Sequence, residues 1–96
     1  MLGFERAVDE IVNALRGCGY EVTLKRDERV ELTVTRGGVS ACVTLIWERG
    51  RLGKLSIRPG CGSGLSVIDC SNVERVKECV DRLLRTLETW SSGAER

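Results

Sequence analysis

Apolar residues recur along the chain at two different spacings, which predict two helices and four strands. In residues 4–15, FERAVDEIVNAL, they fall three or four positions apart, the period of one helix face. Gly17 and Gly19 follow and are expected to end this helix. A second helix is predicted after a capping box of Ser71 and Glu74, in which each side chain satisfies the other residue's backbone N–H. The apolar face of that helix comprises Val73, Val76, Val80, Leu83, Leu84, Leu87 and Trp90.

Between the helices, apolar and polar residues alternate, as in strands with one buried face. The alternating stretches are residues 20–26, 30–36, 39–47 and 54–58. Gly37-Gly38 is typical of a two-residue hairpin turn, which needs positive φ. The pattern predicts an α+β fold: a four-stranded antiparallel meander sheet with an N-terminal and a C-terminal helix packed on one face. We assign residues 1–90 to a single domain and residues 91–96 to a disordered tail.

If both helices cover one face of the sheet, the alternate strand residues form the other face. These are Thr23, Lys25, Thr33, Thr35, Cys42, Thr44, Ile46, Lys54, Ser56 and Arg58. The surface is rich in threonine and has cations at one end. It is expected to face solvent, another subunit or a docked partner.

Positive charge is concentrated in the middle of the chain, although the net charge is only +1. Residues 1–24 carry two cations and four anions, a net of −2, whereas residues 36–64 carry five cations and one anion, a net of +4. The cations of this middle segment are Arg36, Arg49, Arg51, Lys54 and Arg58. This clustering favours an anionic partner for one part of the molecule.

Composition bears on the compartment and on metal binding. Arginine far outnumbers lysine, amides are scarce and histidine is absent, a composition that suggests a thermophile. No signal peptide and no membrane-spanning apolar run are present, so we expect a cytoplasmic protein. The five cysteines include no CxxC pair, which argues against a zinc finger or ribbon and favours disulfides or free thiols. The odd count leaves at least one thiol free or one bridge between subunits.

The glycine-rich stretch GCGSG, residues 60–64, is predicted to be a flexible turn. No Lys-Ser or Lys-Thr follows it, as a phosphate-binding Walker loop requires. The following LSVID looks extended, whereas a dinucleotide fingerprint needs a helix to start inside the glycines. We therefore expect no cofactor at this loop.

Catalytic groups are scarce, and we expect no enzyme activity. Without histidine, Ser-His and Cys-His nucleophile pairs cannot form. The acidic first helix and the following RGCGYEV are similar to the start of restriction-endonuclease-like cores and archaeal junction resolvases. Those cores need a Glu-x-Lys pair to hold Mg²⁺, and Trp47-Glu48-Arg49 departs from it. A degenerate nuclease domain remains an alternative hypothesis.

Nucleic-acid binding fits the charge pattern better. The five cations of residues 36–64 lie on two hairpin ends and the fourth predicted strand, so they are predicted to converge on one edge or face. Trp47 immediately precedes most of them, and Tyr20 and Ile46 offer further stacking or apolar contact. Cations for phosphates beside an aromatic ring for bases are typical of single-strand binding. Trp47 and Tyr20 also share the apolar phase of their strands, so a core role for each stays open.

The chain resembles the ThermoDBP-type single-stranded DNA-binding proteins of hyperthermophilic archaea, in element order, size and composition. The similarity rests on RGCGYEVTL, the Gly37-Gly38 hairpin, the basic ERGRLGKLSIR strip and the final Leu-rich helix. It implies helices on an antiparallel sheet and an oligomer that holds single-stranded DNA in a basic and apolar cleft. The leucine zipper of the longer members is missing here, so a dimer or tetramer would assemble through the sheet or helices. We thus predict binding of single-stranded DNA, with RNA not excluded; the other alternative is a protein–protein interaction subunit.

Overall fold

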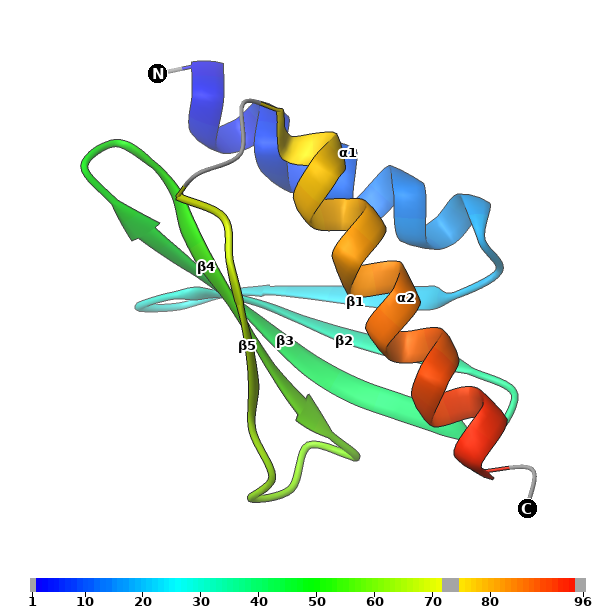
Figure 1. Cartoon of the computed structure of the whole chain (residues 1–96). Coiled ribbons are helices and arrows are strands. Elements are labelled where there is room, and N and C mark those ends of the chain that lie inside the picture. Colours follow the sequence, from blue (N-terminus) through cyan, green and yellow to red (C-terminus); the bar gives the residue numbers. More distant parts are fainter. Residues whose placement is uncertain (1, 72–74, 95–96) are drawn as a thin grey trace.

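The computed structural model describes residues 2–71 and 75–94. The chain order is α1 (Leu2–Gly17), β1 (Glu21–Arg26), β2 (Val30–Arg36), β3 (Val39–Glu48), β4 (Arg51–Pro59), β5 (Ser66–Asp69) and α2 (Val76–Ala94). The strands form one antiparallel sheet in the order β1-β2-β3-β4-β5, and both helices cover the same face of it (Figure 1). The predicted α+β meander is confirmed. We call the sheet face that points away from the helices the outer face.

The predicted count of four strands is wrong, because the sheet has a fifth strand, β5. It pairs with β4, with Val67 opposite Ser56 and Ile68 opposite Leu55. The residues of LSVID predict an extended segment within the connecting loop, and no pairing with the sheet follows from them. The strand has only four residues and follows three closely spaced glycines, so it is too short to show a clear alternating pattern.

Element boundaries differ from the predicted ones at two further places. β4 begins at Arg51, and the register shifts by one residue where Ile46 pairs with Lys54 but Trp47 pairs with Leu52. This β-bulge extends the hairpin beyond the alternating run 54–58. α2 continues to Ala94, so residues 91–94 belong to the helix and not to the predicted tail. Adding a residue to a helix that has already formed costs little free energy.

The predicted capping box of the second helix lies partly outside the described residues. Glu74 belongs to the segment 72–74, and Ser71 instead donates from its backbone N and its Oγ to Asp69 Oδ1, at 2.9 and 2.6 Å. The backbone N of Arg75 donates to Glu78 Oε2 at 3.4 Å, just before α2 begins at Val76. A carboxylate therefore accepts from an exposed backbone N–H at this helix start, as capping requires.

The core lies between the helices and the inner sheet face. Leu32, Val43 and Ile57 are fully buried and lie side by side across β2, β3 and β4. Ile11 of α1 and Leu83 of α2 cover them from the helix layer. Burying each such side chain contributes about 1.5–3 kcal/mol, so this apolar layer is the main source of stability. The predicted alternation is confirmed for the apolar residues of β2, β3 and β4, whereas in β1 Val22 is buried but Leu24, expected on the same buried face, is 38% exposed.

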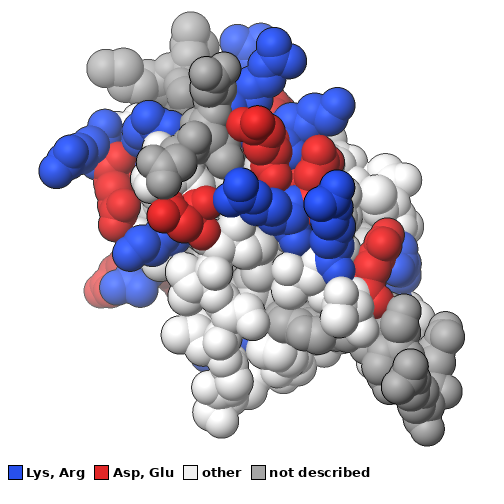
Figure 2. Space-filling model, viewed as in Figure 1, with Lys and Arg blue, Asp and Glu red and all other residues white. Residues whose placement is uncertain are grey.

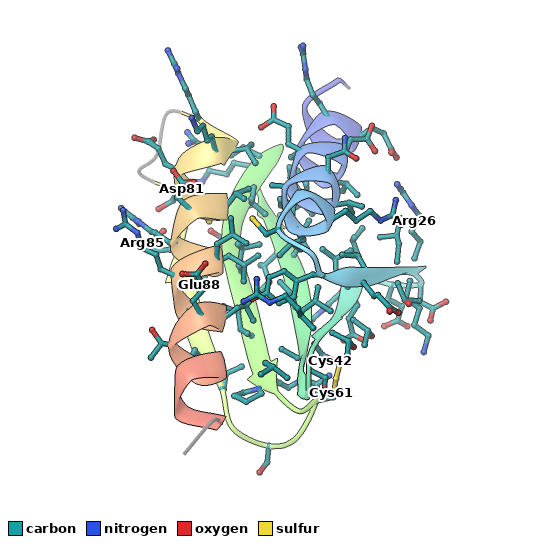
Figure 3. The ribbon with its side chains drawn as sticks, turned by 90° about the vertical axis from the view of Figure 1, so that its right-hand side faces the viewer. Arg26, Cys42, Cys61, Asp81, Arg85 and Glu88 are labelled. Atoms are coloured by element: carbon teal, nitrogen blue, oxygen red, sulfur yellow. A yellow bond between two sulfur atoms is a disulfide. The ribbon has the colours of Figure 1, made fainter. Side chains whose placement is uncertain are left out.

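Two disulfides fix the segment around β5. Cys42, on the outer face of β3, is bonded to Cys61 in the loop after β4 (Figure 3). Cys70, at the end of β5, is bonded to Cys79 of α2. Cys18 is the free cysteine and is exposed. The pairing, which the sequence left open, thus joins the glycine-rich loop to the sheet and β5 to the second helix.

The two ends of the sheet differ in what they carry. At one end lie the β1–β2 turn, residues 27–29, and the β3–β4 turn, residues 49–50; we call this the Trp47 end. At the other end lie the β2–β3 turn, residues 37–38, and the glycine-rich loop, residues 60–65; we call this the glycine-loop end. The two ends are far apart, because β3 runs from one to the other and its ten residues span roughly 33 Å.

Candidate nucleic-acid interface

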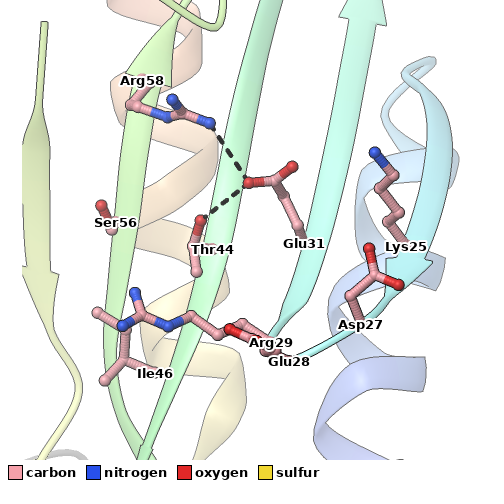
Figure 4. A pocket seen from close by; sticks show the side chains of 9 residues that line it. All are labelled: Lys25, Asp27, Glu28, Arg29, Glu31, Thr44, Ile46, Ser56 and Arg58. Atoms are coloured by element: carbon pink, nitrogen blue, oxygen red, sulfur yellow. Dashed lines mark hydrogen bonds and ion pairs between the residues drawn. The ribbon is translucent and has the colours of Figure 1, made fainter. Parts of the chain in front are cut away.

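A hollow of about 900 Å³ lies on the outer face beside the β1–β2 turn. Its side chains come from four neighbouring strands and that turn, and Figure 4 shows them. They are Lys25, Asp27, Glu28, Arg29, Glu31, Thr44, Ile46, Ser56 and Arg58. The strand register explains the grouping, because Lys25, Glu31, Thr44 and Ser56 occupy one row across the sheet.

The charges of this hollow balance. Three cations, from Lys25, Arg29 and Arg58, face three carboxylates, from the turn and β2. One carboxylate oxygen, Glu31 Oε2, lies 3.3 Å from Arg58 Nη2 and accepts a hydrogen bond from Thr44 Oγ1 at 3.4 Å. A phosphate that reached Arg58 would therefore compete with Glu31. The hollow offers hydrogen bonds and an apolar floor at Ile46, but no net positive potential of its own.

A second hollow, of about 570 Å³, lies next to the first and leads to Trp47. The two hollows share Ile46 and the β1–β2 turn residues, and the second adds Arg26 and Trp47. The indole is half-buried against the core, so part of it stays accessible. Trp47 thus packs on the core and also lines a surface hollow, and its stacking on a base stays a prediction.

The β3–β4 turn carries the arginines that sequence analysis emphasised. Arg49 and Arg51 line a third hollow, of about 490 Å³, together with Glu48, Gly53 and Ser71. Arg49 has φ 56° and Gly50 has φ 78°, the pair of positive φ values that a tight two-residue hairpin turn requires. Arg49 therefore lies in the turn beyond the paired strands, and Arg51 is the first residue of β4, opposite Glu48. Nearby, Lys54 Nζ lies 4.0 Å from Glu48 Oε2, a distant and exposed ion pair.

The Trp47 end therefore brings together most of the residues predicted to bind nucleic acid. Ile46, Trp47, Arg49, Arg51 and Lys54 follow one another around the β3–β4 hairpin. Arg58 lies further along β4, in the outer-face hollow.

Arg36 and Tyr20 do not join this group, and the expectation that Arg36 converges with the other cations is wrong. Both residues lie at the glycine-loop end, where the Arg36 guanidinium carbon is 4.4 Å from the Tyr20 ring centroid. Arg36 Nη1 donates to the backbone oxygen of Cys18 at 2.9 Å. Tyr20 is buried, with 4% of its surface exposed, so its ring is a core element and offers no stacking face to a base.

The predicted nucleic-acid site omits the cations of the β1–β2 hairpin, Lys25, Arg26 and Arg29, which line the first two hollows. The meander order carried the necessary signal, because the turn between the first two strands must lie beside the end of the third strand. Arg26 is already engaged: its guanidinium donates two 2.8 Å hydrogen bonds to the Glu5 carboxylate (Figure 3 labels Arg26). That charged partner lowers the pKa of Glu5 below its usual value.

Within residues 2–71 and 75–94, no group of three or more Cys, Asp or Glu side chains is arranged to hold a metal ion. No helix there is long and apolar enough to cross a membrane. The chain matches no protein-family model, no curated protein and no solved structure. Function has to be inferred from the site itself.

Proposed function

We propose that this protein binds single-stranded nucleic acid, most readily DNA, at the Trp47 end of its sheet, without catalysing a reaction. The observation that carries the proposal is the convergence of two hairpins. The β3–β4 turn brings Arg49 and Arg51 to one side of Ile46 and Trp47, and the β1–β2 turn brings Arg29 to the other. Cations on both sides of an accessible ring suit a strand whose phosphates and bases must be held at once.

Each group has a distinct role in this proposal. Arg49, Arg51 and Lys54 contact successive phosphates, because they lie around one hairpin on the exposed surface. The exposed part of Trp47 stacks on a base, which contributes about 1–3 kcal/mol and is tolerant of sequence. Ile46 provides an apolar floor beside it. Arg58 engages a phosphate only when it leaves Glu31.

The resemblance to the ThermoDBP-type proteins supports the same conclusion. The described fold keeps the expected layer of helices on an antiparallel meander, with one strand more than expected. The two disulfides suit the thermophile origin that the composition suggests, since disulfides persist in the cytosol of hyperthermophiles. We propose a cytoplasmic protein that acts as a homo-oligomer.

The test is fluorescence anisotropy of a labelled oligo-dT of about 20 nucleotides, titrated at several salt concentrations, with tryptophan quenching read in the same samples. The chain has two tryptophans, so a Trp47→Phe variant assigns the quenching. Each phosphate contact contributes about −0.7 to the slope of log affinity against log salt. Salt-sensitive binding with quenching that disappears in W47F supports the proposal, whereas no binding at low salt rejects it.

Two matched triple variants distinguish binding at this site from binding that depends only on the net charge of the protein. A triple variant, Arg49→Ser, Arg51→Ser and Arg58→Ser, should reduce the magnitude of the salt slope by about 1.4, from the contacts of Arg49 and Arg51, because Glu31 already engages Arg58. A control triple removes the same charge elsewhere: Arg6→Ser and Arg85→Ser on the helices, with Arg36→Ser at the glycine-loop end. Equal losses in both triples would show that binding follows net charge and not this site. Mg²⁺ added to the same samples tests the nuclease alternative, because cleavage would shorten the oligonucleotide.

A further inference from the structure

β5 forms one edge of the sheet, and β5 together with the residue before it carries two of the three large exposed apolar side chains among the described residues. Leu65 is 62% exposed and Val67 is 53% exposed, and the remaining large exposed apolar side chain among the described residues, Leu24, is 38% exposed. Val67 lies opposite Ser56 and therefore points to the outer face. Leu65, two residues earlier, continues the same phase. Two apolar side chains thus stand in a row beside an edge that pairs with no further strand in the described chain.

Charge is absent from this part of the molecule. Residues 59–68, PGCGSGLSVI, contain no charged residue. Figure 2, seen from the side of the helices, agrees with this: charged side chains gather on the upper part of the view, and white, uncharged residues fill its lower left part, where Figure 1 places the loop before β5. The opposite edge strand, β1, carries Glu21, Lys25 and Arg26. Charges on an edge strand prevent it from pairing with another chain, so β1 is protected and β5 is not.

The two disulfides hold this exposed segment in place. Cys61 anchors its beginning to β3, and Cys70 anchors its end to α2. A four-residue strand held only by β4 would fray readily, whereas a strand fixed at both ends is already ordered before it meets a partner. Ordering the strand in advance lowers the entropic cost of association.

From these features we propose that β5 pairs antiparallel with β5 of a second copy of this chain, which joins the two sheets into one. A two-fold axis perpendicular to the sheet places the outer faces of the two copies on the same side of the joined sheet. With this symmetry, the residue at the axis pairs with the same residue of the second copy. We place Val67 opposite Val67 at the centre of the ladder, because this register brings all four β5 residues of both copies into pairs. Leu65 then lies opposite Asp69 of the second copy. The inference is independent of nucleic-acid binding.

The edge is compatible with itself, because its central pairs carry no charge and a second copy brings the same uncharged and already ordered strand. In this register the two Asp69 carboxylates are four residues apart along the ladder, or about 13 Å, so they repel little at ordinary ionic strength. The net charge of +1 per chain adds no strong repulsion. The uncharged loops, residues 59–64, flank the ladder. With only four strand residues and two exposed apolar side chains per copy, the buried area falls below the roughly 1,200 Å² of standard interfaces. We therefore expect a reversible dimer in the micromolar range.

Sedimentation equilibrium over a range of concentrations, with a disulfide-trapping variant, tests the proposal. Wild-type protein should approach the mass of two 10.6 kDa chains as its concentration rises. In a Cys18→Ser background, Val67→Cys should crosslink two chains under mild oxidation, because paired residues across strands lie about 4.5–5.5 Å apart between Cα atoms. Thr23→Cys, at an exposed outer-face position of the edge strand β1, is the matched control and should not crosslink.

Val67→Lys gives a second, independent readout. Two lysines facing each other at the centre of the ladder should weaken dimerisation at least about tenfold, while circular dichroism shows an intact fold. A protein that stays monomeric up to about 1 mM, the weak end of specific association, overturns the proposal. So does a dimer whose affinity V67K leaves unchanged, or one that T23C traps and V67C does not, since either would place the interface elsewhere.

Discussion

Glu31 and Arg58 form an ion pair across the middle of the outer face, although their strands β2 and β4 are separated by β3. Their charged groups lie 3.3 Å apart above Thr44, whose hydroxyl donates to the same carboxylate oxygen. The Arg58 side chain is 40% exposed and that of Glu31 is 30% exposed, so water screens the pair and its contribution to stability is at most about 1 kcal/mol. The main effect of Glu31 is electrostatic: it neutralises a cation that could otherwise contact a phosphate.

Glu31→Gln should therefore strengthen binding of single-stranded DNA. The change releases Arg58 and removes one negative charge from the hollow, so the salt slope should steepen by about 0.7 and the affinity at low salt should rise several-fold. The measurement is the oligo-dT titration described above. Glu21→Gln is the matched control, because Glu21 is an exposed acid of β1 near the glycine-loop end. Unchanged or weaker binding by E31Q would mean that the nucleic acid does not reach this hollow.

Arg49→Gly should change the stability of the protein and its affinity for DNA in opposite directions. Arg49 occupies a left-handed conformation with φ 56°, which glycine adopts without the cost that a side chain imposes. We expect the variant to be more stable by about 0.5–1 kcal/mol in chemical denaturation and yet to bind DNA more weakly, because it lacks one phosphate contact. Arg51→Gly, within β4, should lose both stability and affinity, since glycine weakens a strand. Parallel losses in the two variants would contradict the assignment.

Alternation along the chain was sufficient to predict four of the strands, because their apolar residues repeat every two positions, although β1 buries Val22 alone. Val30, Leu32 and Val34 are buried, as their phase predicts. β5 shows no such pattern. Its Ile68 is only partly buried, its Val67 is exposed, and its position is fixed by pairing with β4 and by the Cys70–Cys79 bond. Those are long-range interactions, and local periodicity carries no information about them.

The candidate site was predicted only where its residues are neighbours in sequence. Residues 46–54 form one hairpin, so their proximity follows from the turn. Arg36 was grouped with them by composition, although its strand ends at the opposite end of the sheet. Arg29 was omitted because it is distant in sequence, although the meander returns it to the side of Ile46. Counting charges along a sequence window therefore predicts the cations of the β3–β4 hairpin. It wrongly includes Arg36 and wrongly omits Arg29.

Replacing Cys42 and Cys61 together with serine should lower the free energy of unfolding by about 3 kcal/mol. The bond closes a loop with a sequence separation of 19, and constraining a loop of that size in the unfolded chain gives this magnitude. For a domain of this length the melting temperature should fall by roughly 12–24 °C. Cys18→Ser is the control; this exposed and unbonded residue should change stability by less than about 0.5 kcal/mol. Similar melting temperatures for all three proteins would mean that the bridge contributes no net stability.

Tyr20→Phe should remove a specific loss of stability at alkaline pH. Burial raises the pKa of Tyr20 above its usual value of 10.0, because the phenolate is disfavoured away from water. In the unfolded chain the phenol ionises near pH 10, whereas in the folded protein it stays neutral to higher pH. The free energy of unfolding should therefore be unaffected by this group below pH 10 and should fall as the pH rises through the folded-state pKa.

Denaturant titrations at a series of pH values from 7 to 11, compared between wild type and Y20F, measure this effect. At pH 7 the variant should be as stable as wild type or more stable by up to about 1 kcal/mol, because the buried hydroxyl finds no hydrogen-bond partner among the described residues. Above pH 10 the two curves should diverge, with wild type losing stability faster as the difference between its folded and unfolded tyrosine pKa takes effect. Curves that stay parallel up to pH 11 would show that the Tyr20 hydroxyl reaches water or a partner in the folded protein.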